Sequence, residues 1–172
     1  MSTPSATARF TIRATTWADM AAVDGLLART YPKLLKADYP PSVLVTALPI
    51  ISRAKPELIS SGTYYVVEES GVILGAGGWT RDRAHPGLGH IRHVVTDYCA
   101  VRRGVGRALM LHCFATARDA GINWMECWAT RTAVPFYEAM GFQTIRPIDV
   151  TLQGGIVFPS VRMLRPLVDT KD

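Results

Sequence analysis

The sequence predicts a mixed α/β domain in which helices flank one central sheet. Three stretches support this fold class. Residues 91–121 run from an apolar strand through a glycine-rich turn into a helix, residues 64–79 form an apolar hairpin, and residues 144–163 contain two further strands. With 172 residues, of which 48% are hydrophobic, the chain is long enough to bury one sizeable core. We therefore expect a single domain over residues 1–172.

The N-terminal part begins with a strand and two helical regions. Phe10–Arg13 alternates as a short strand, and Thr16 is a suitable N-cap for a helix over Trp17–Thr30 whose apolar positions share one face. Residues 41–60 read as helical but contain interior prolines. We expect a helix over Ser42–Arg53 followed by a looser piece.

A hairpin follows. Its strands, Tyr64–Glu68 and Val72–Trp79, are joined at the turn residues Ser70 and Gly71. Three glycines in the second strand mark either a bulge or close approach of two backbones, or a weakened strand end, and the sequence leaves these readings open. These glycines are Gly75, Gly77 and Gly78.

The second half of the chain alternates strands and helices. The loop Arg81–Gly89 is rich in glycine and proline and is expected to be mobile. The later elements are a strand over Ile91–Thr96, a helix from Val105 that ends at Gly121, a strand over Asn123–Ala129, a closing helix from Pro135 to Gly141, and strands over Thr144–Val150 and Gly155–Met163.

The turn before the long helix is an expected anion site. Gly104 and Gly106 allow the backbone to approach a ligand, and the first free N–H groups of the helix point outward at the positive end of its dipole. Arg102, Arg103 and Arg107 add forked donors suited to phosphate oxygens. Neither the P-loop sequence Gly-Lys-Ser/Thr nor the dinucleotide pattern G-x-G-x-x-G is present, so the turn predicts a phosphate site of another kind.

Two ordered motifs lie in this half of the chain. Val101 to Gly106 fits the pattern Gln/Arg-x-x-Gly-x-Gly/Ala except at its first position, and Ala133 to Phe142 fits A-x-x-F-Y-x-x-x-G-F. Together they resemble the GNAT superfamily of N-acetyltransferases, whose turn holds the pyrophosphate of acetyl-CoA. Because Val101 replaces the usual Gln or Arg, that phosphate contact would pass to Arg102 or Arg103.

The resemblance implies a fold and a donor site. The GNAT fold has a mostly antiparallel central sheet flanked by helices and splayed at the acetyl-CoA cleft, where a bulge frees main-chain groups for the pantetheine arm. Acetyl-CoA is therefore the expected acyl-donor substrate. The residues expected to bind it are Val94, Val95, Thr96, Val101, Arg102, Arg103, Gly104, Val105, Gly106, Arg107, Thr130 and Phe136.

The activity that the resemblance implies is transfer of an acetyl group to an amine by direct attack in a ternary complex. Tyr137 falls where the family commonly places the general acid for the departing thiolate. A phenol has a pKa of about 10 and a thiol of about 8.5, so the phenol can donate a proton and regain it. The alternative is that Tyr137 is a packing residue beside Phe136.

The general base is less defined by the sequence. His93 titrates nearest neutral pH and is one candidate, and Glu126 on the following strand is another, with His90 and Asp97 nearby. A purely structural role is an equal alternative for His93, and Glu126 is also suited to pairing with an arginine. The aromatic residues Trp79, Trp124, Trp128 and Tyr98 are expected mainly in the core, with one or two at the acceptor pocket.

Composition limits the partners. The formal net charge of +5 suggests an anionic partner, but the basic residues are dispersed, which argues against nucleic acid and favours CoA at the arginine cluster. No apolar stretch is long enough to cross a membrane, and Met1–Arg13 lacks a secretory core, so we expect a cytoplasmic protein. Three scattered cysteines indicate reduced thiols and no metal site.

Several alternatives stay open at this point. The acceptor is a small-molecule amine or a peptide amine, and a homodimer is compatible with the sequence. A rival function is a non-catalytic acyl-CoA-binding domain that serves as a sensor or interaction module. Retention of Tyr137 favours the enzyme.

Overall fold

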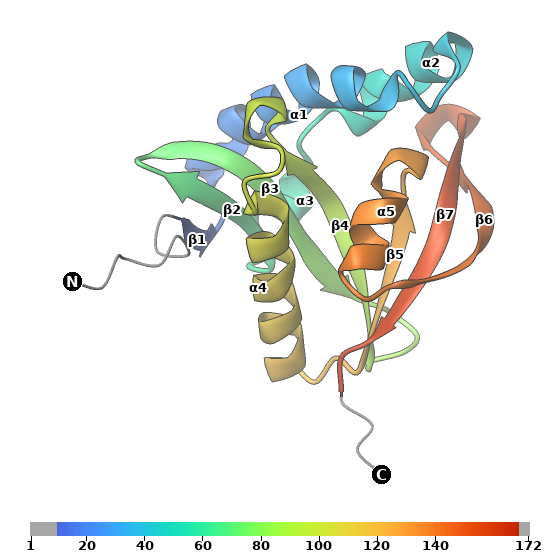
Figure 1. Cartoon of the computed structure of the whole chain (residues 1–172). Helices are drawn as coiled ribbons and strands as arrows, with labels where there is room; N and C mark the ends of the chain where they lie inside the picture. Colours follow the sequence, from blue (N-terminus) through green and yellow to red (C-terminus); the bar gives the residue numbers. More distant parts are fainter. Residues whose placement is uncertain (1–9, 169–172) are drawn as a thin grey trace.

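The computed structural model of the protein describes residues 10–168, so most of the polar N-terminal segment and the last four residues lie outside the described part. One seven-stranded sheet, in the order β1-β2-β3-β4-β5-β7-β6, runs through this part, and helices cover both of its faces (Figure 1). The strands are β1 (Thr11–Ala14), β2 (Tyr64–Glu69), β3 (Val72–Arg81), β4 (Leu88–Thr96), β5 (Trp124–Ala129), β6 (Gln143–Thr151) and β7 (Val157–Pro166). The helices are α1 (Met20–Leu35), α2 (Pro41–Ile51), α3 (Pro56–Ile59), α4 (Val105–Asp119) and α5 (Val134–Ala139).

The sheet is mostly antiparallel. Only the β4 and β5 pair is parallel among the described strands, and α4 forms the crossover between them. A parallel pair requires such a crossover because its strands enter the sheet from the same end. The mixed fold predicted from the sequence is confirmed. Within residues 10–168, none of the helices combines the length and the apolar character that crossing a bilayer requires.

Side chains of β2 show how both faces of the sheet are buried. Tyr64 and Val66 pack with α1 and α3 on one face, and the alternate residues Tyr65 and Val67 pack with α4 on the other. A third cluster joins the end of α1 to α2 and β7 around the stacked rings of Tyr39 and Phe158. This cluster fixes α2 over the end of the sheet where the site lies.

The glycines of β3 are explained by close approach. A Cβ atom on Gly78 would lie 2.1 Å from the carbonyl oxygen of Thr63, and one on Gly77 would lie 2.8 Å from Cγ2 of Val94. Both distances are shorter than real carbon contacts permit. β3 also continues past these residues to Arg81, so the alternative of a weakened strand end is wrong.

The predicted end of the first helix and the predicted start of β4 are wrong. The first helix continues to Leu35 instead of ending at Thr30, because its last turn buries Leu35 against the α2 cluster. β4 begins at Leu88 instead of Ile91, because its first residues pair with β3 on one side and β5 on the other. Neither long-range contact has a local sequence signal.

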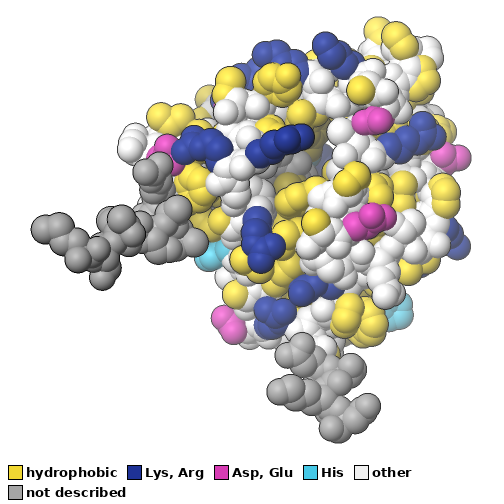
Figure 2. All heavy atoms as spheres, in the orientation of Figure 1, with side chains coloured by type: hydrophobic (Ala, Val, Ile, Leu, Met, Phe, Trp, Pro, Cys, Tyr) yellow, Lys and Arg dark blue, Asp and Glu magenta, His cyan; other side chains and the backbone are white. Residues whose placement is uncertain are grey.

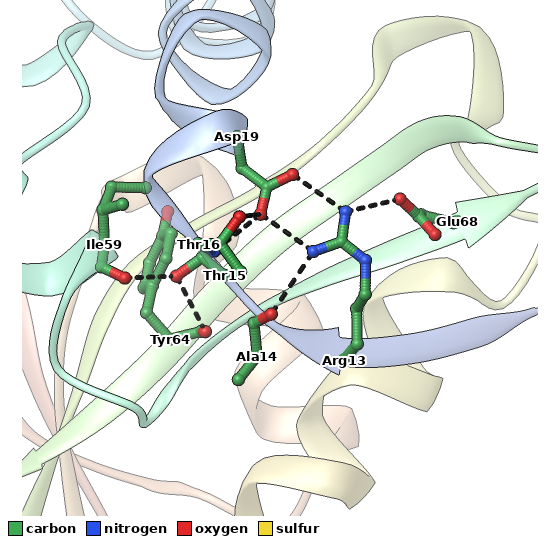
Figure 3. A network of polar contacts seen from close by, with 8 residues as sticks. All are labelled: Arg13, Ala14, Thr15, Thr16, Asp19, Ile59, Tyr64 and Glu68. Carbon is green, nitrogen blue, oxygen red and sulfur yellow. Dashed lines mark hydrogen bonds and ion pairs between the residues drawn. The ribbon is translucent and has the colours of Figure 1, made fainter.

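A polar network ties the first strand to the sheet (Figure 3). Both Nη groups of Arg13 donate to Asp19 at 2.8 Å, and one also donates to Glu68 on β2 at 2.7 Å. Thr15 donates its hydroxyl to the carbonyl of Ile59 at 2.8 Å, which holds α3 against the start of α1. The bidentate contact with Arg13 lowers the pKa of Asp19. The network lies away from the candidate site and is structural.

Candidate active site

The central feature is the separation of β4 from β5. The two strands pair in parallel from Leu88 with Trp124 to His90 with Glu126, and no pairing continues beyond that point although both strands do. Figure 1 shows the strands together at one end and apart at the other. The edge of β4 that faces β5 is therefore free of strand partners over its second half, as the predicted splay requires.

A bulge lies where the strands separate. Ala76 pairs with Val95 and Gly78 with Arg92, so two residues of β4, His93 and Val94, face Gly77 alone. His93 has a φ of 51°, in the left-handed region that a residue with a side chain seldom adopts. The carbonyls of both bulge residues accept hydrogen bonds from tyrosine hydroxyls, at 2.9 Å from Tyr64 and 3.0 Å from Tyr31. Tyr64, which is buried, and Tyr31, which is half-buried, stabilise the unusual backbone.

A cavity of about 690 Å³ opens between the separated strands. Its size is within the range of sites that bury most of a small organic ligand. The walls come from β4, β5, the start of α4, α5 and the ends of α1 and α2. The predicted residues among its lining are His93, Val94, Val95, Thr96, Val101, Arg102, Gly104, Val105, Gly106, Arg107, Thr130, Phe136 and Tyr137.

The start of α4 opens into this cavity without a cap. Gly104, the N-cap residue, has a φ of 83°, and no side chain bonds to the first turn of the helix. The first backbone bond of the helix runs from Ala108 N–H to the Gly104 carbonyl at 3.0 Å, so earlier N–H groups are free for an anion. A Cβ on Gly106 would lie 3.1 Å from the Phe136 ring, which allows α5 to approach α4.

Two of the three predicted arginines reach the cavity. Arg102 and Arg107 line it beside the α4 start. Arg103 points away, because its guanidinium forms an ion pair with Glu69 at 2.7 Å and lies over the Phe10 ring. Figure 2 shows Lys and Arg side chains along α4 and above its start, beside a recess between α4 and α5.

Tyr137 lies on α5 at the inner wall of the cavity. Its ring packs edge-on against Phe136 and Phe142, and only 5% of the residue is exposed. Burial, together with the neighbouring Cys127 thiol, raises the pKa of Tyr137 well above its usual value. The phenol therefore carries its proton throughout the physiological pH range.

The sequence comparison agrees with this geometry. The family model described as Acetyltransferase (GNAT) domain matches residues 37–163, which is most of the chain and contains the whole cavity wall from α2 to β7. The chain belongs to the GNAT family. As a member of this family, the protein is an N-acetyltransferase that uses acetyl-CoA as its donor. None of the curated protein sequences compared with it matches.

Solved structures with this GNAT fold share little sequence with the chain. A GCN5-related N-acetyltransferase from Rhodopseudomonas palustris matches with a TM-score of 0.76 at 20% identity, covering 96% of this chain and 97% of that one. PaiA N-acetyltransferase from Thermoplasma acidophilum, in complex with coenzyme A, matches with a TM-score of 0.71 at 12% identity, covering 91% and 98%. N-acetylglutamate synthase from Neisseria gonorrhoeae matches with a TM-score of 0.66 at 18% identity, but the chain spans only 35% of it and is itself covered to 92%.

The two base candidates of this GNAT enzyme have different surroundings. His93 lines the cavity, and its Nε2 is 2.7 Å from the Ile51 carbonyl, which can only accept, so Nε2 carries the proton. Nδ1 then holds the lone pair and has no partner among the described residues, although it is covered. Burial lowers the pKa of His93 to about 4, so the ring is neutral at pH 7 but weakly basic.

Glu126 does not line the cavity. Its carboxylate is buried, forms an ion pair with the Arg162 Nε group and lies 3.3 Å from His90 Nδ1. His90 Nε2 is 2.7 Å from Asp82. The arginine pairing that the sequence left as an alternative for Glu126 is therefore present, and both His90 nitrogens face carboxylates.

A second, polar hollow of about 560 Å³ adjoins the cavity on the side away from α4. The two share Lys55, Leu58, His90, Arg92 and Trp128 in their walls. Lys55 and Arg92 were not among the residues expected at the site, although Arg92 lies two residues after His90 on β4, a spacing that places both on one face of a strand. The expectation of a mainly buried set of aromatic residues is wrong, because Trp79 is 5% exposed whereas Tyr98 and Trp124 are 53% and 45% exposed. Trp128, which is 50% exposed, lines both the cavity and the hollow, as expected for one or two of these residues.

Proposed function

We propose that the protein transfers the acetyl group of acetyl-CoA to a primary amine by direct attack in a ternary complex. The observation that carries this proposal is the shape of the cleft. One end opens on the uncapped start of α4, the other end opens on the polar hollow, and the bulge at His93 lies between them. Donor and acceptor can therefore enter from opposite sides and meet at the bulge.

The residues present fit acetyl-CoA. The free N–H groups of Val105, Gly106 and Arg107 are suited to the pyrophosphate, with Arg102 and Arg107 side chains beside them. The unpaired edge of β4 over Val94 to Thr96 offers main-chain donors and acceptors to the pantetheine amides. When bound, acetyl-CoA supplies a thioester carbonyl activated for attack by an amine. Val101, Thr130 and Phe136 complete the proposed wall.

The cysteines support direct transfer over a covalent acetyl-enzyme. Cys127 lines the cavity, but burial raises the pKa of its thiol to about 12, so the nucleophilic thiolate is scarce at pH 7. Cys113 is likewise buried, with its pKa raised to about 12, and Cys99 is exposed away from the cavity lining. The amine itself is then the nucleophile.

Tyr137 is the proposed general acid for the departing thiolate. Tyr137 lines the cavity, its phenol remains protonated, and a hydrogen bond with the Cys127 side chain orients it. A group that holds its proton until negative charge develops beside it can donate at that moment and be reprotonated afterwards.

His93 is the proposed acceptor of the amine proton. Its neutral ring has its lone pair on Nδ1 and is held at the bulge by the bond of Nε2 to Ile51. Because Nδ1 is covered, a small displacement of the ring or of α2 must open it as the amine binds. Glu126 would act only indirectly, by holding His90 in place.

A thiol-release assay tests the function. Acetyl-CoA and a panel of amines should yield free CoA and an acetylated product that mass spectrometry identifies, with CoA alone raising the melting temperature. CoA binding without transfer to any amine would instead support the non-catalytic sensor. No CoA binding would contradict the donor site.

A homodimer is a further proposal. β6 is the outer strand of the sheet, no described strand pairs with its free edge, and most of its residues are exposed. An open edge can pair with the same edge of a second copy. Light scattering after size exclusion should give the mass of two chains, and the mass of one chain would overturn this proposal.

A further inference from the structure

Arg92 forms no ion pair with any described residue, and the carboxylates of Asp82 and Glu126 act on its charge only from a longer distance. Its side chain is half-buried in the wall shared by the cavity and the polar hollow, and its Nε donates to the Thr80 hydroxyl at 2.8 Å. Neither Nη group has a hydrogen bond or an ion pair with any described residue. Burial lowers the pKa of Arg92 from its ordinary value. A partly buried guanidinium with free donors is costly unless something negative meets it.

The nearest carboxylates are already committed to other groups. Asp82 accepts from the backbone N–H groups of Ala84 and His85 and contacts His90 at 2.7 Å. Glu126 is shared between Arg162 and His90. Neither carboxylate is therefore bonded to an Nη group of Arg92, and Glu57, the other carboxylate in the wall of the hollow, forms no ion pair with it either.

Other residues of the hollow add to this character. Lys55 and Arg83 line it, and neither forms an ion pair within the described part of the chain. Trp128, which is 50% exposed, and the side chain of Leu58 supply an apolar wall beside them. A ligand that matches this surface has a negative group near Arg92 and an apolar group against Trp128.

We propose that the acceptor is a small amino acid with a free carboxylate and an apolar side chain, and that Arg92 binds the carboxylate. This inference rests on the proposed function, since it names the acceptor of the same reaction. Arg92 immediately precedes the bulge residue His93 in β4, so a carboxylate held there keeps the neighbouring amine close to the bulge. The planar fork of an arginine is suited to two parallel hydrogen bonds with a carboxylate.

Matched acceptors test the proposal. The probes are L-phenylalanine and L-leucine, each compared with its amide and with the amine that lacks the carboxyl group, 2-phenylethylamine and 3-methylbutylamine. The wild-type kcat/KM should favour each free amino acid by about tenfold or more after correction for the fraction of unprotonated amine, because a charge-assisted contact is lost otherwise. Arg92→Gln should remove this preference by lowering kcat/KM for the free amino acids to that for the uncharged amines, while Arg92→Lys should keep part of it.

Controls separate this inference from the function on which it rests. Arg146→Gln removes the same charge from exposed β6 and should keep the full preference. A CoA-induced melting shift equal to that of the wild type shows that Arg92→Gln is folded. Binding of N-acetyl-L-phenylalanine to the CoA-loaded protein should weaken about tenfold in Arg92→Gln.

Equal rates for amino acids and uncharged amines in the wild type would overturn the proposal and leave acetyl transfer intact. A preference that survives in Arg92→Gln would also overturn it, as would failure of N-acetyl-L-phenylalanine to bind the wild-type protein. If the wild-type protein does not bind CoA, the proposed function is overturned instead.

Discussion

The two ends of the cleft differ in whether main-chain or side-chain groups line them. At the donor end the chemistry comes from the main chain: the uncapped first turn of α4, the left-handed Gly104 and the unpaired edge of β4. At the acceptor end it comes from side chains, chiefly Arg92, Lys55 and Trp128, brought from three separate segments. A main-chain site tolerates changes of side chain, whereas a side-chain site changes its ligand with one substitution. The donor end is therefore suited to one constant molecule and the acceptor end to a variable one.

The largest expected loss of turnover comes from substitution of Tyr137, between the two ends of the cleft. Tyr137→Phe removes one oxygen and keeps the ring contacts with Phe136 and Phe142. Turnover should fall by about 10² to 10⁴, the range of lost proton donation, with the CoA-induced melting shift unchanged. Tyr65→Phe is the matched control, since it removes a hydroxyl that bonds Thr116 outside the cavity lining. Full turnover across the pH range with a good acceptor would reduce Tyr137 to a packing residue.

One added negative charge at the donor end should abolish CoA binding. Gly104→Asp places a carboxylate at the start of α4, where a Cβ meets nothing within 4 Å, so the fold should survive. At 100 times its dissociation constant, CoA stabilises the wild type by about 2.7 kcal/mol, and this stabilisation should disappear. Differential scanning fluorimetry with and without CoA measures it.

Gly121→Asp provides the control for backbone strain. Gly121 has a φ of 85° and equally open surroundings but lies at the other end of α4. It should keep the CoA shift. An undiminished shift in Gly104→Asp would show that the anion does not bind at the α4 start.

Substitution of His93 tests whether its ring accepts the amine proton at the bulge. His93→Gln should lower turnover by roughly 10²-fold at saturating acetyl-CoA if the ring accepts the proton. Unchanged turnover would move the base to a water molecule or to the Asp82 and His90 pair. CoA binding, which uses main-chain groups elsewhere, should be unaffected in either case.

The pH dependence of the free energy of unfolding measures the pKa of the His93 ring. Burial holds the pKa of His93 at about 4 in the native state, against about 6.5 in the unfolded chain. Between these values the unfolded chain binds the extra proton, so the contribution of His93 to stability is complete above pH 6.5 and falls as the pH drops toward 4. Urea unfolding should show the wild type losing roughly 2 kcal/mol more than His93→Gln between pH 7.5 and 4.5. Parallel curves would mean that the ring titrates normally.

The smallest effects distinguish arginines of one cluster. Arg107→Gln should weaken CoA binding by roughly tenfold, because its side chain lines the cavity at the phosphate end. Arg103→Gln should change CoA affinity by less than about twofold, since Arg103 is paired with Glu69 and points away. Isothermal titration of CoA compares the two. Equal losses would show that Arg103 turns toward the ligand.

The turn and the helix start at Gly104 were predicted correctly from the sequence because their determinants are local. Gly104, which takes a left-handed conformation, and the first turn of the helix beside it lie within one stretch of six residues, 101–106. The direction of Arg103 was missed because its partner Glu69 lies 34 residues away. The placement of Lys55 and Arg92 beside Trp128 was not predicted for the same reason, because these residues become neighbours only when the sheet forms.

The bulge illustrates the limit most clearly. Glycines in β3 signalled an irregularity and the family resemblance implied a bulge at the cleft, but neither gave the residues of the bulge or the positive φ of His93. Both depend on the register between two strands. Burial of His93 under Ile51, which lowers its pKa, follows from α2 packing over the sheet and has no pattern in the chain near His93.

A crystal structure with CoA tests the division of the cleft most directly. The pyrophosphate should accept hydrogen bonds from the N–H groups of Val105 to Arg107, and the pantetheine arm should run along Val94 to Thr96 with the thiol ending near His93 and Tyr137. The polar hollow around Arg92 should remain open to an acceptor. CoA phosphates bound at Arg92 and Lys55, with the start of α4 free, would contradict the assignment of both ends.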